Sequence, residues 1–169
     1  MTLTFSFSKP LTLGDSDMSA KLSTLADIHA ALTEQGKTVE LLDGSVAVAM
    51  GSSSHPIVSV LTIEDENLVI TCQLAKFGEI PEDNLAAFAL AALDANTRIH
   101  PYSVGYLSDT DGQEGSEDEW PIVLINSVPL GDLSNEELDS AMESLLAAIT
   151  GVTDVIRIGI EGIKEPCAA

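Results

Sequence analysis

TVELLDGSVAVAM, residues 38–50, decides the fold class, because two apolar runs in it are joined by only two residues. These two, Asp43 and Gly44, supply the positive backbone φ angles that a two-residue hairpin turn requires. The next runs, IVSVLTI (57–63) and LVITCQLA (68–75), are rich in β-branched residues and are joined by the polar stretch EDEN. Residues 38–75 are therefore predicted to form an antiparallel meander of four strands, or of three if the first is very short.

A helix is predicted on each side of this meander. Before it, apolar residues recur at helical spacing over residues 19–35, and Gly36 stands where a helix C-terminus favours glycine. After it, Pro81 marks the start of a second helix, which should end near Thr97 because Pro101 disfavours helical geometry at the preceding residue. The predicted buried positions are Leu22, Leu25, Ala26, His29 and Leu32 in the first helix and Leu85, Phe88, Ala89, Ala92 and Leu93 in the second.

The remaining chain adds two strands and a C-terminal helical region. YSVGYLS (102–108) and WPIVLINSV (120–128) have strand composition. Ser134 and Glu137 have the spacing of a capping box, which predicts a helix over 135–150. Residues 152–163 repeat at helical spacing although they are β-branched, so helix is favoured there and strand stays open.

This order of elements predicts an α+β fold. The antiparallel sheet has five to six strands with helices packed on one side, in the order α-β-β-β-α-β-β-α. The length predicts a single domain over 1–169, with 1–15 as an N-terminal arm or short edge strand and 164–169 as a frayed tail. The stretch GSSSHP (51–56) is predicted to be a loop.

The chain is strongly acidic, with a formal net charge of −20, although 45% of its residues are hydrophobic and its mean hydropathy is +0.23. That apolar content predicts a folded chain, and the charge repels nucleic acid and anionic membranes. Three interpretations of the acidity stay open: solubility or salt adaptation, a basic protein partner, and mimicry of DNA.

Two cysteines form no disulfide framework, and residues 1–15 lack the features of a secretion signal, so we expect a cytoplasmic protein.

Motifs of the common catalytic and cofactor sites are missing from the sequence. The three His and two Cys have no zinc-ligand spacing, and no nucleophile elbow, Walker loop or dinucleotide fingerprint occurs. We therefore expect no enzyme, no cofactor and no metal site. An enzyme stays open only through a site assembled from residues far apart in the sequence.

The stretch DTDGQEGSEDE, residues 109–119, carries six acids in eleven positions. An EF-hand loop from Asp109 fails, because Glu114 stands where the turn needs glycine and Trp120 where a bidentate glutamate closes the site. A weak calcium site, a solvated loop and a contact surface for a basic protein stay open. Trp120 beside the acids is typical of an interface anchor, or else it caps the core where its strand begins. The candidate interaction surface comprises Asp109, Asp111, Glu114, Glu117, Asp118, Glu119 and Trp120.

The C-terminal apolar stripe from Leu138 to Ile163 is longer than docking on a six-stranded sheet requires, which leaves room for contact with a second copy.

The sequence resembles the YjfI family of small bacterial proteins of unknown function. The resemblance lies in RIHPYSVGYLSDTDG (98–112), in the apolar strand that follows it and in SNEELDSAMESLLAAI (134–149). The order of elements likewise resembles the type III secretion chaperone-like fold. This resemblance implies a cytoplasmic, dimeric, non-enzymatic protein that binds another protein, although the long acidic loop and the N-terminal arm depart from the secretion chaperones.

Together these features predict a non-enzymatic, cytoplasmic protein-binding module of the adaptor, regulator or chaperone type. It would use its sheet face or its acidic rim to engage a basic or amphipathic protein segment.

Overall fold

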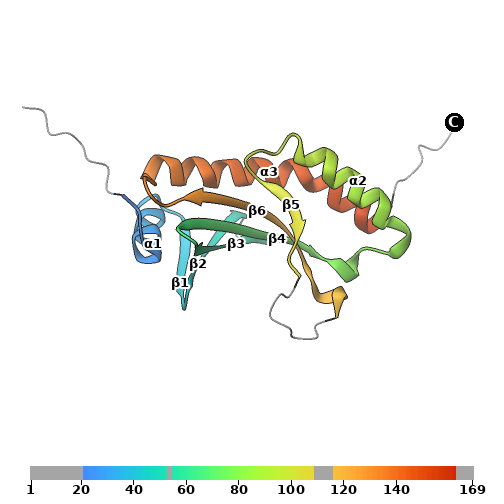
Figure 1. Ribbon diagram of the computed structural model, residues 1–169, viewed down its shortest axis with the longest axis horizontal. Coiled ribbons are helices and arrows are strands. Elements are labelled where there is room, and N and C mark those ends of the chain that lie inside the picture. Colours follow the sequence, from blue (N-terminus) through green and yellow to red (C-terminus); the bar gives the residue numbers. More distant parts are fainter. Residues whose placement is uncertain (1–20, 53–54, 109–115, 163–169) are drawn as a thin grey trace, which may run out of the picture.

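Six antiparallel strands and three α-helices make up the fold in a computed structural model, which describes residues 21–52, 55–108 and 116–162. The strands lie side by side in the order β1-β2-β3-β4-β6-β5. Helix α3 runs along the length of the sheet, with α1 near one of its ends and α2 near the other (Figure 1). The predicted α+β class with an antiparallel sheet is confirmed. The elements are α1 (Leu25–Glu34), β1 (Thr38–Leu42), β2 (Ser45–Ser52), β3 (His55–Glu64), β4 (Asn67–Lys76), α2 (Leu85–Asn96), β5 (Ser103–Tyr106), β6 (Pro121–Pro129) and α3 (Asn135–Glu161), with short 3-10 turns η1 (Phe77–Glu79), η2 (Glu82–Asn84) and η3 (Glu117–Glu119).

Turn chemistry sets the register of the meander. Gly44 has φ +78° in the hairpin between β1 and β2, and Asp65 and Glu66 have φ +46° and +65° in the turn between β3 and β4. The short first run does pair, so the meander has four strands. The loop predicted at 51–56 is wrong in extent, because β2 and β3 continue into it from both sides.

Helix α1 begins six residues later than the predicted start at residue 19, at Leu25. The Thr24 hydroxyl accepts from the Asp27 backbone N–H at 3.1 Å, and the Asp27 carboxylate accepts from the Thr24 N–H at 3.0 Å. This reciprocal cap stops the helix from extending toward the N-terminus. The buried face is also rotated from the prediction: its buried residues are Ile28, Ala31 and Leu32, whereas Ala26 is exposed.

Helix α3 is continuous over 27 residues, so the two predicted C-terminal segments form one helix and 152–161 are helical. The capping box at Ser134 is confirmed, since its hydroxyl accepts from the Glu137 N–H at 3.2 Å. Gly151 lies inside the helix, where an added Cβ would sit 3.1 Å from the Ile99 side chain. The glycine that ends the helix is Gly162, with φ +77°.

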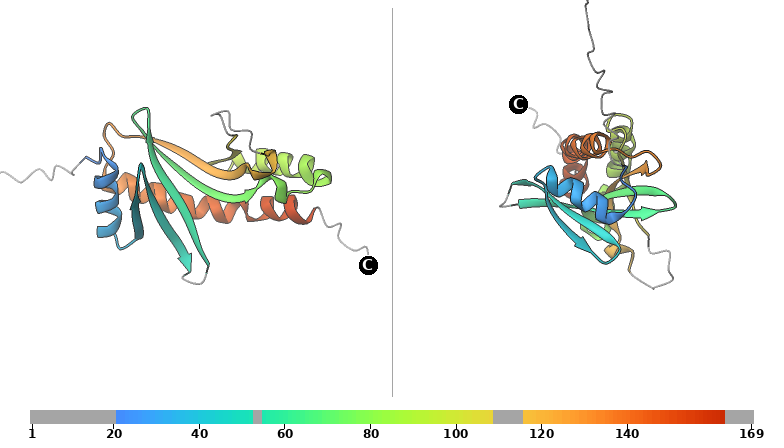
Figure 2. Two further views of the ribbon diagram at one scale, coloured as in Figure 1. Left: turned by 90° about the horizontal axis from the view of Figure 1, so that it is seen from below. Right: turned by 90° about the vertical axis from the view of Figure 1, so that its left-hand side faces the viewer.

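The main core lies between one face of the sheet and the helices, and α2 and α3 lie together on that side (Figure 2). One row across the sheet shows the pattern: Val48, Ser59, Cys72 and Leu124 are directly opposite one another and almost fully buried. The neighbouring residues in each strand point to the opposite face. The predicted arm at 1–15 and tail at 164–169 lie outside the described residues.

Candidate functional site

The face of the sheet that points away from the helices carries an apolar surface. A row of directly paired residues crosses it from Glu40 through Ala47, Val60 and Thr71 to Ile125. Val58 and Val60 are 49% and 38% exposed, whereas Ser59 and Leu61, which alternate with them, are 0% exposed. We call this surface the open face and define it by Ala47, Ala49, Val58, Val60, Thr71, Gln73 and Ile125.

The open face is hollowed toward its β6 side. A shallow depression of about 690 Å³ lies over β3, β4 and β6. Val58 and Val60 line it, together with Glu79 and Pro121. Because Pro121 directly follows Trp120, the depression adjoins the end of the predicted interaction surface.

Negative charge dominates the border of the open face. Glu40 and Glu64 are exposed acids on it, and Glu79 borders the depression. The six strands contain a single Lys or Arg, Lys76, whose Nζ lies 2.6 Å from Oε2 of Glu119. Hydrogen bonding and charge attraction from Glu119 raise the pKa of Lys76 above its ordinary value. The lysine therefore carries its charge but is already paired.

The described part of the acidic stretch is the turn η3, which is docked on η1. The Phe77 N–H donates to the Trp120 carbonyl at 2.8 Å, and a Cβ added to Gly78 would sit 2.7 Å from the Asp118 Cβ. Glycine at position 78 thus lets the two turns approach closely. Glu117, Asp118 and Glu119 are all exposed.

The structure places only part of the predicted interaction surface. Glu117, Asp118, Glu119 and Trp120 come together beside η1, whereas Asp109, Asp111 and Glu114 lie outside the described residues. Trp120 is half-buried and stacks on Tyr106, with ring centroids 5.6 Å apart and planes 1° apart. The suggestion of a calcium site in the loop stays a prediction, and across 21–52, 55–108 and 116–162 no three His, Cys, Asp or Glu side chains gather as metal ligands would.

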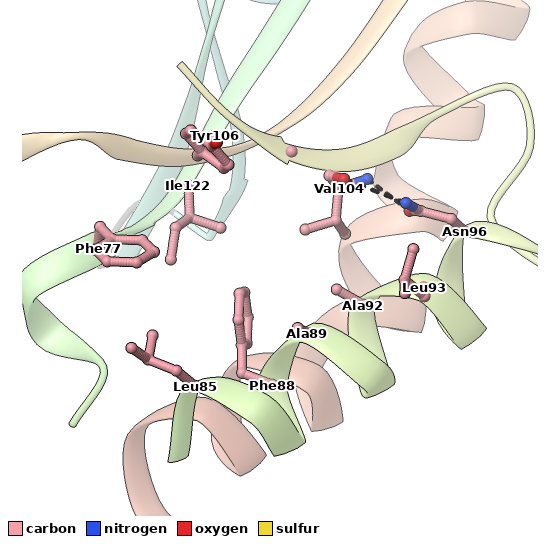
Figure 3. Close-up of a pocket in the computed structure, with 11 residues that line it drawn as sticks. Phe77, Leu85, Phe88, Ala89, Ala92, Leu93, Asn96, Val104, Tyr106 and Ile122 are labelled. Carbon is pink, nitrogen blue, oxygen red and sulfur yellow. Dashed lines mark hydrogen bonds between the residues drawn. The ribbon is translucent and has the colours of Figure 1, made fainter. Parts of the chain in front are cut away.

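A second apolar surface lies on the helix side, between α2 and the edge strand β5. Leu85, Phe88 and Leu93 of α2 point toward Val104 and Tyr106 across a groove of about 390 Å³ (Figure 3). Phe77 and Ile122 complete its far wall. We call this the α2 groove.

The α2 groove is lined by all five residues that were predicted to be core on α2. Of these five only Ala92 is buried, and Leu93 is 65% exposed. The predicted buried stripe is therefore wrong in part. The physical reason is that β5, at four residues, is too short to cover the stripe.

One polar side chain closes the groove at the C-terminal end of α2. Asn96 accepts from the Val104 N–H at 2.7 Å and donates to the Val104 carbonyl at 3.2 Å (Figure 3). Its amide thus holds both main-chain groups of this residue in the edge strand, and it fixes the distance between α2 and β5. The sequence did not single out Asn96.

Two buried ionisable groups have a structural role in the core. Burial raises the pKa of the Cys72 thiol to about 11 and that of the Tyr102 hydroxyl to about 12. The Tyr102 hydroxyl donates to the Ala141 carbonyl of α3 at 2.9 Å. Both groups therefore stay protonated at neutral pH and neither lines the open face or the α2 groove.

In the described part of the chain, no helix is long and apolar enough to cross a membrane.

Comparisons with known proteins find solved structures with a similar fold but no family to which the sequence can be assigned. No protein-family model matches the sequence, and no curated protein matches it. The crystal structure of YbjN from E. coli, described as a proposed transcription regulator, is similar with a TM-score of 0.55 at 10% identity; the match covers 78% of this chain and 92% of YbjN. A chain in the crystal structure of the ExsC-ExsE complex is similar with a TM-score of 0.49 at 13% identity, covering 88% of this chain and 100% of that one. The fold is thus similar to that of YbjN, and the YjfI resemblance stays a prediction.

Proposed function

We propose that this chain is a non-enzymatic, cytoplasmic protein-binding module of the adaptor, regulator or chaperone type, and that its open face takes a basic amphipathic segment of another protein. The observation that carries the proposal is the exposure of Val58 and Val60 at the centre of an acid-bordered sheet face. Exposed apolar side chains rimmed by charge are typical of protein-binding surfaces.

The charges select the chemistry of the segment. Glu40, Glu64 and Glu79 border the apolar centre, and the turn η3 adds three more acids at one end. A segment with apolar side chains on one side and Lys or Arg at its margins would bury the first on the valines and pair the second with these acids. Charge pairing of this kind raises the association rate and weakens as salt rises.

Three further points support a protein partner. The described similarity in fold to YbjN is consistent with a regulator. The net charge of −20 disfavours direct binding of DNA, so a regulator of this composition would act through another protein. The YjfI resemblance implies the same kind of function.

The test uses two synthetic peptides that have the same leucines and differ only in carrying Lys or Glu at the intervening positions. Their binding to the full chain is measured by calorimetry at low and at high salt. We expect the Lys peptide to bind, the Glu peptide to bind at least about tenfold more weakly, and high salt to weaken the Lys peptide.

A variant pair locates the site. Val58→Thr with Val60→Thr keeps shape and β propensity but removes apolar surface, so it should weaken the Lys peptide about tenfold. Leu146→Gln, at a residue that is 41% exposed on α3, is the matched control and should bind as the parent chain does. If the Lys peptide does not bind, or binds equally to both variants, the proposal is wrong.

A further inference from the structure

The stretch TLTFSFSK, residues 2–9, has the chemistry that the open face requires of a partner. Leu3, Phe5 and Phe7 alternate with Thr and Ser, and Lys9 continues the same period. In an extended chain these apolar side chains and the lysine all point to one side. We propose that this segment of the chain lies on its own open face and competes with the partner for it. The competition rests on the proposed function, whereas the docking does not.

Charge lets this segment approach the open face. Residues 1–14 contain no acid, although 27 of the 169 residues of the chain are Asp or Glu. The acids that border the open face, Glu40, Glu64 and Glu79, therefore attract the segment through Lys9 and do not repel any other part of it.

Every Lys and Arg of the described residues already pairs with an acid of this chain. The pairs are Lys21–Asp132, Lys37–Asp139, Lys76–Glu119, Arg98–Asp94 and Arg157–Asp154. The three acids that border the open face take part in none of these pairs. Of the two basic residues that remain, Lys9 and Lys164, only Lys9 belongs to an alternating apolar stretch.

The described chain begins close to the open face. Lys21 lines a hollow together with residues of the turn between β3 and β4. Val60 lies five residues before Asp65, the first residue of this turn, which is about 17 Å at the rise of a β-strand. Residues 8–20 can span up to about 45 Å, so Phe7 can reach Val60 with length to spare.

The α2 groove is a less favourable place for the same segment. Helices α1 and α2 lie near opposite ends of the sheet (Figure 1). The groove residue Phe88 packs against Gly159, which is 24 residues, or about 36 Å, along α3 from its first residue. The groove is also lined by no acid that could pair with Lys9. Reach and charge therefore both favour the open face.

The period of the segment matches that of β3. Val58 and Val60 are two residues apart on the open face, and Glu64 follows on the same face, nearer the turn. Because the segment enters from the turn, it runs in the same direction as β3. Its two phenylalanines then lie over the two valines, and Lys9 lies at Glu64.

A spin label tests the docking directly. In a Cys167→Ser background, Ser8→Cys carries a nitroxide on the side of the segment that faces water, and Cys72 is too deeply buried to be labelled. We expect the nitroxide to broaden the amide NMR signals of Val60 and of Thr71, which lies directly opposite it, much more than the signal of Leu90 in α2.

Two variant pairs of the labelled chain provide the control. Phe5→Ser with Phe7→Ser removes the apolar side chains and should abolish the broadening at Val60. Thr2→Ser with Thr4→Ser changes the opposite side of the segment and should retain it. The docking would be overturned if the signal of Val60 were not broadened, or were broadened equally in both pairs. It would also be overturned if the broadening arose only between a labelled and an unlabelled copy.

Peptide binding tests the competition separately. The chain with Phe5→Ser and Phe7→Ser should bind the Lys peptide at least about tenfold more tightly than the parent chain, because its open face is free. The chain with Thr2→Ser and Thr4→Ser should bind it as the parent chain does. Equal affinities of both variants would overturn the competition. If the Lys peptide binds to none of these chains while the signal of Val60 is broadened, the proposed function is wrong and the docking stands.

Discussion

Asn96 holds Val104 by both of its main-chain groups, accepting from the N–H at 2.7 Å and donating to the carbonyl at 3.2 Å. Val104 lies in β5, the last strand of the sheet, and no strand of the described residues lies beside its outer edge. A side-chain amide thus takes the place that a neighbouring peptide group would have, and it ties α2 to the sheet.

Replacing Asn96 should loosen this attachment. Asn96→Ala leaves two main-chain groups at the edge strand without their partner, so we expect a loss of about 1–3 kcal/mol in the free energy of unfolding, measured by urea denaturation. Asn96→Asp retains the acceptor for the Val104 N–H but not the donor, so its loss of stability should be intermediate. A loss below about 0.5 kcal/mol for Asn96→Ala would show that the bonds are not important for stability.

Two adjacent leucines of α3 differ in burial, so substituting each of them tests how the helix is oriented. Leu145 is 0% exposed and Leu146 is 41% exposed, so the same substitution should have different effects. Leu145→Ala should lower the free energy of unfolding by about 2–5 kcal/mol, because it leaves a cavity against the sheet. Leu146→Ala should change it by about 0.5 kcal/mol or less. Equal effects would contradict the orientation of α3.

The buried thiol of Cys72 should be unreactive in the folded chain. Because burial raises its pKa to about 11, its thiolate fraction at neutral pH is very small, and access is closed as well. In a Cys167→Ser background, labelling of native protein at pH 8 should be at least about a hundredfold slower than labelling in denaturant. Rapid native labelling would show that the core opens near β4.

The same shifts set the stability of the protein at alkaline pH. The pKa values of Cys72 and Tyr102 are raised in the folded state, to about 11 and about 12, so the unfolded chain releases these protons first. Stability should therefore fall as the pH rises above about 9, the ordinary value for cysteine. The fall should be smaller in Cys72→Ala and Tyr102→Phe, compared by urea unfolding between neutral and alkaline pH.

Acid should remove the stabilising contribution that the ionised Asp27 carboxylate makes in the capping box of α1. Hydrogen bonds from Thr24 and Ser23 lower the pKa of Asp27 below its ordinary 3.8, so the ionised form stabilises the folded state. This contribution is complete above pH 3.8 and is lost as the pH falls through the lowered value. Asp27→Asn should thus be less stable than the parent chain at pH 7, and the difference should vanish in strong acid. A difference that persists there would indicate another cause.

The sequence predicted those features that depend on local chemistry. The turn at Asp43 and Gly44, the capping box at Ser134 and the alternating strands are present as expected. Each of these signals acts over a few residues, where backbone sterics and hydrogen bonding favour one conformation in any surrounding. The α+β class followed from the order of these elements.

The sequence-based predictions were wrong where the outcome depends on which elements pack against a helix. The helix predicted over 135–150 should have ended before Gly151, but α3 continues through this residue because the glycine fits against Ile99. The apolar stripe of α2 reads as core, but β5 is too short to cover it. An apolar stripe predicts that one side of a helix should be covered, but it does not predict which element covers that side.

By itself, then, the sequence determined which segments form strands and helices and that the exterior would be acidic. Only the tertiary structure decided which apolar residues stay uncovered: Val58 and Val60 on the open face, and Leu90 and Leu93 on α2. The reason is that local patterns encode the period of an element, whereas burial depends on the lengths and positions of the elements that pack against it.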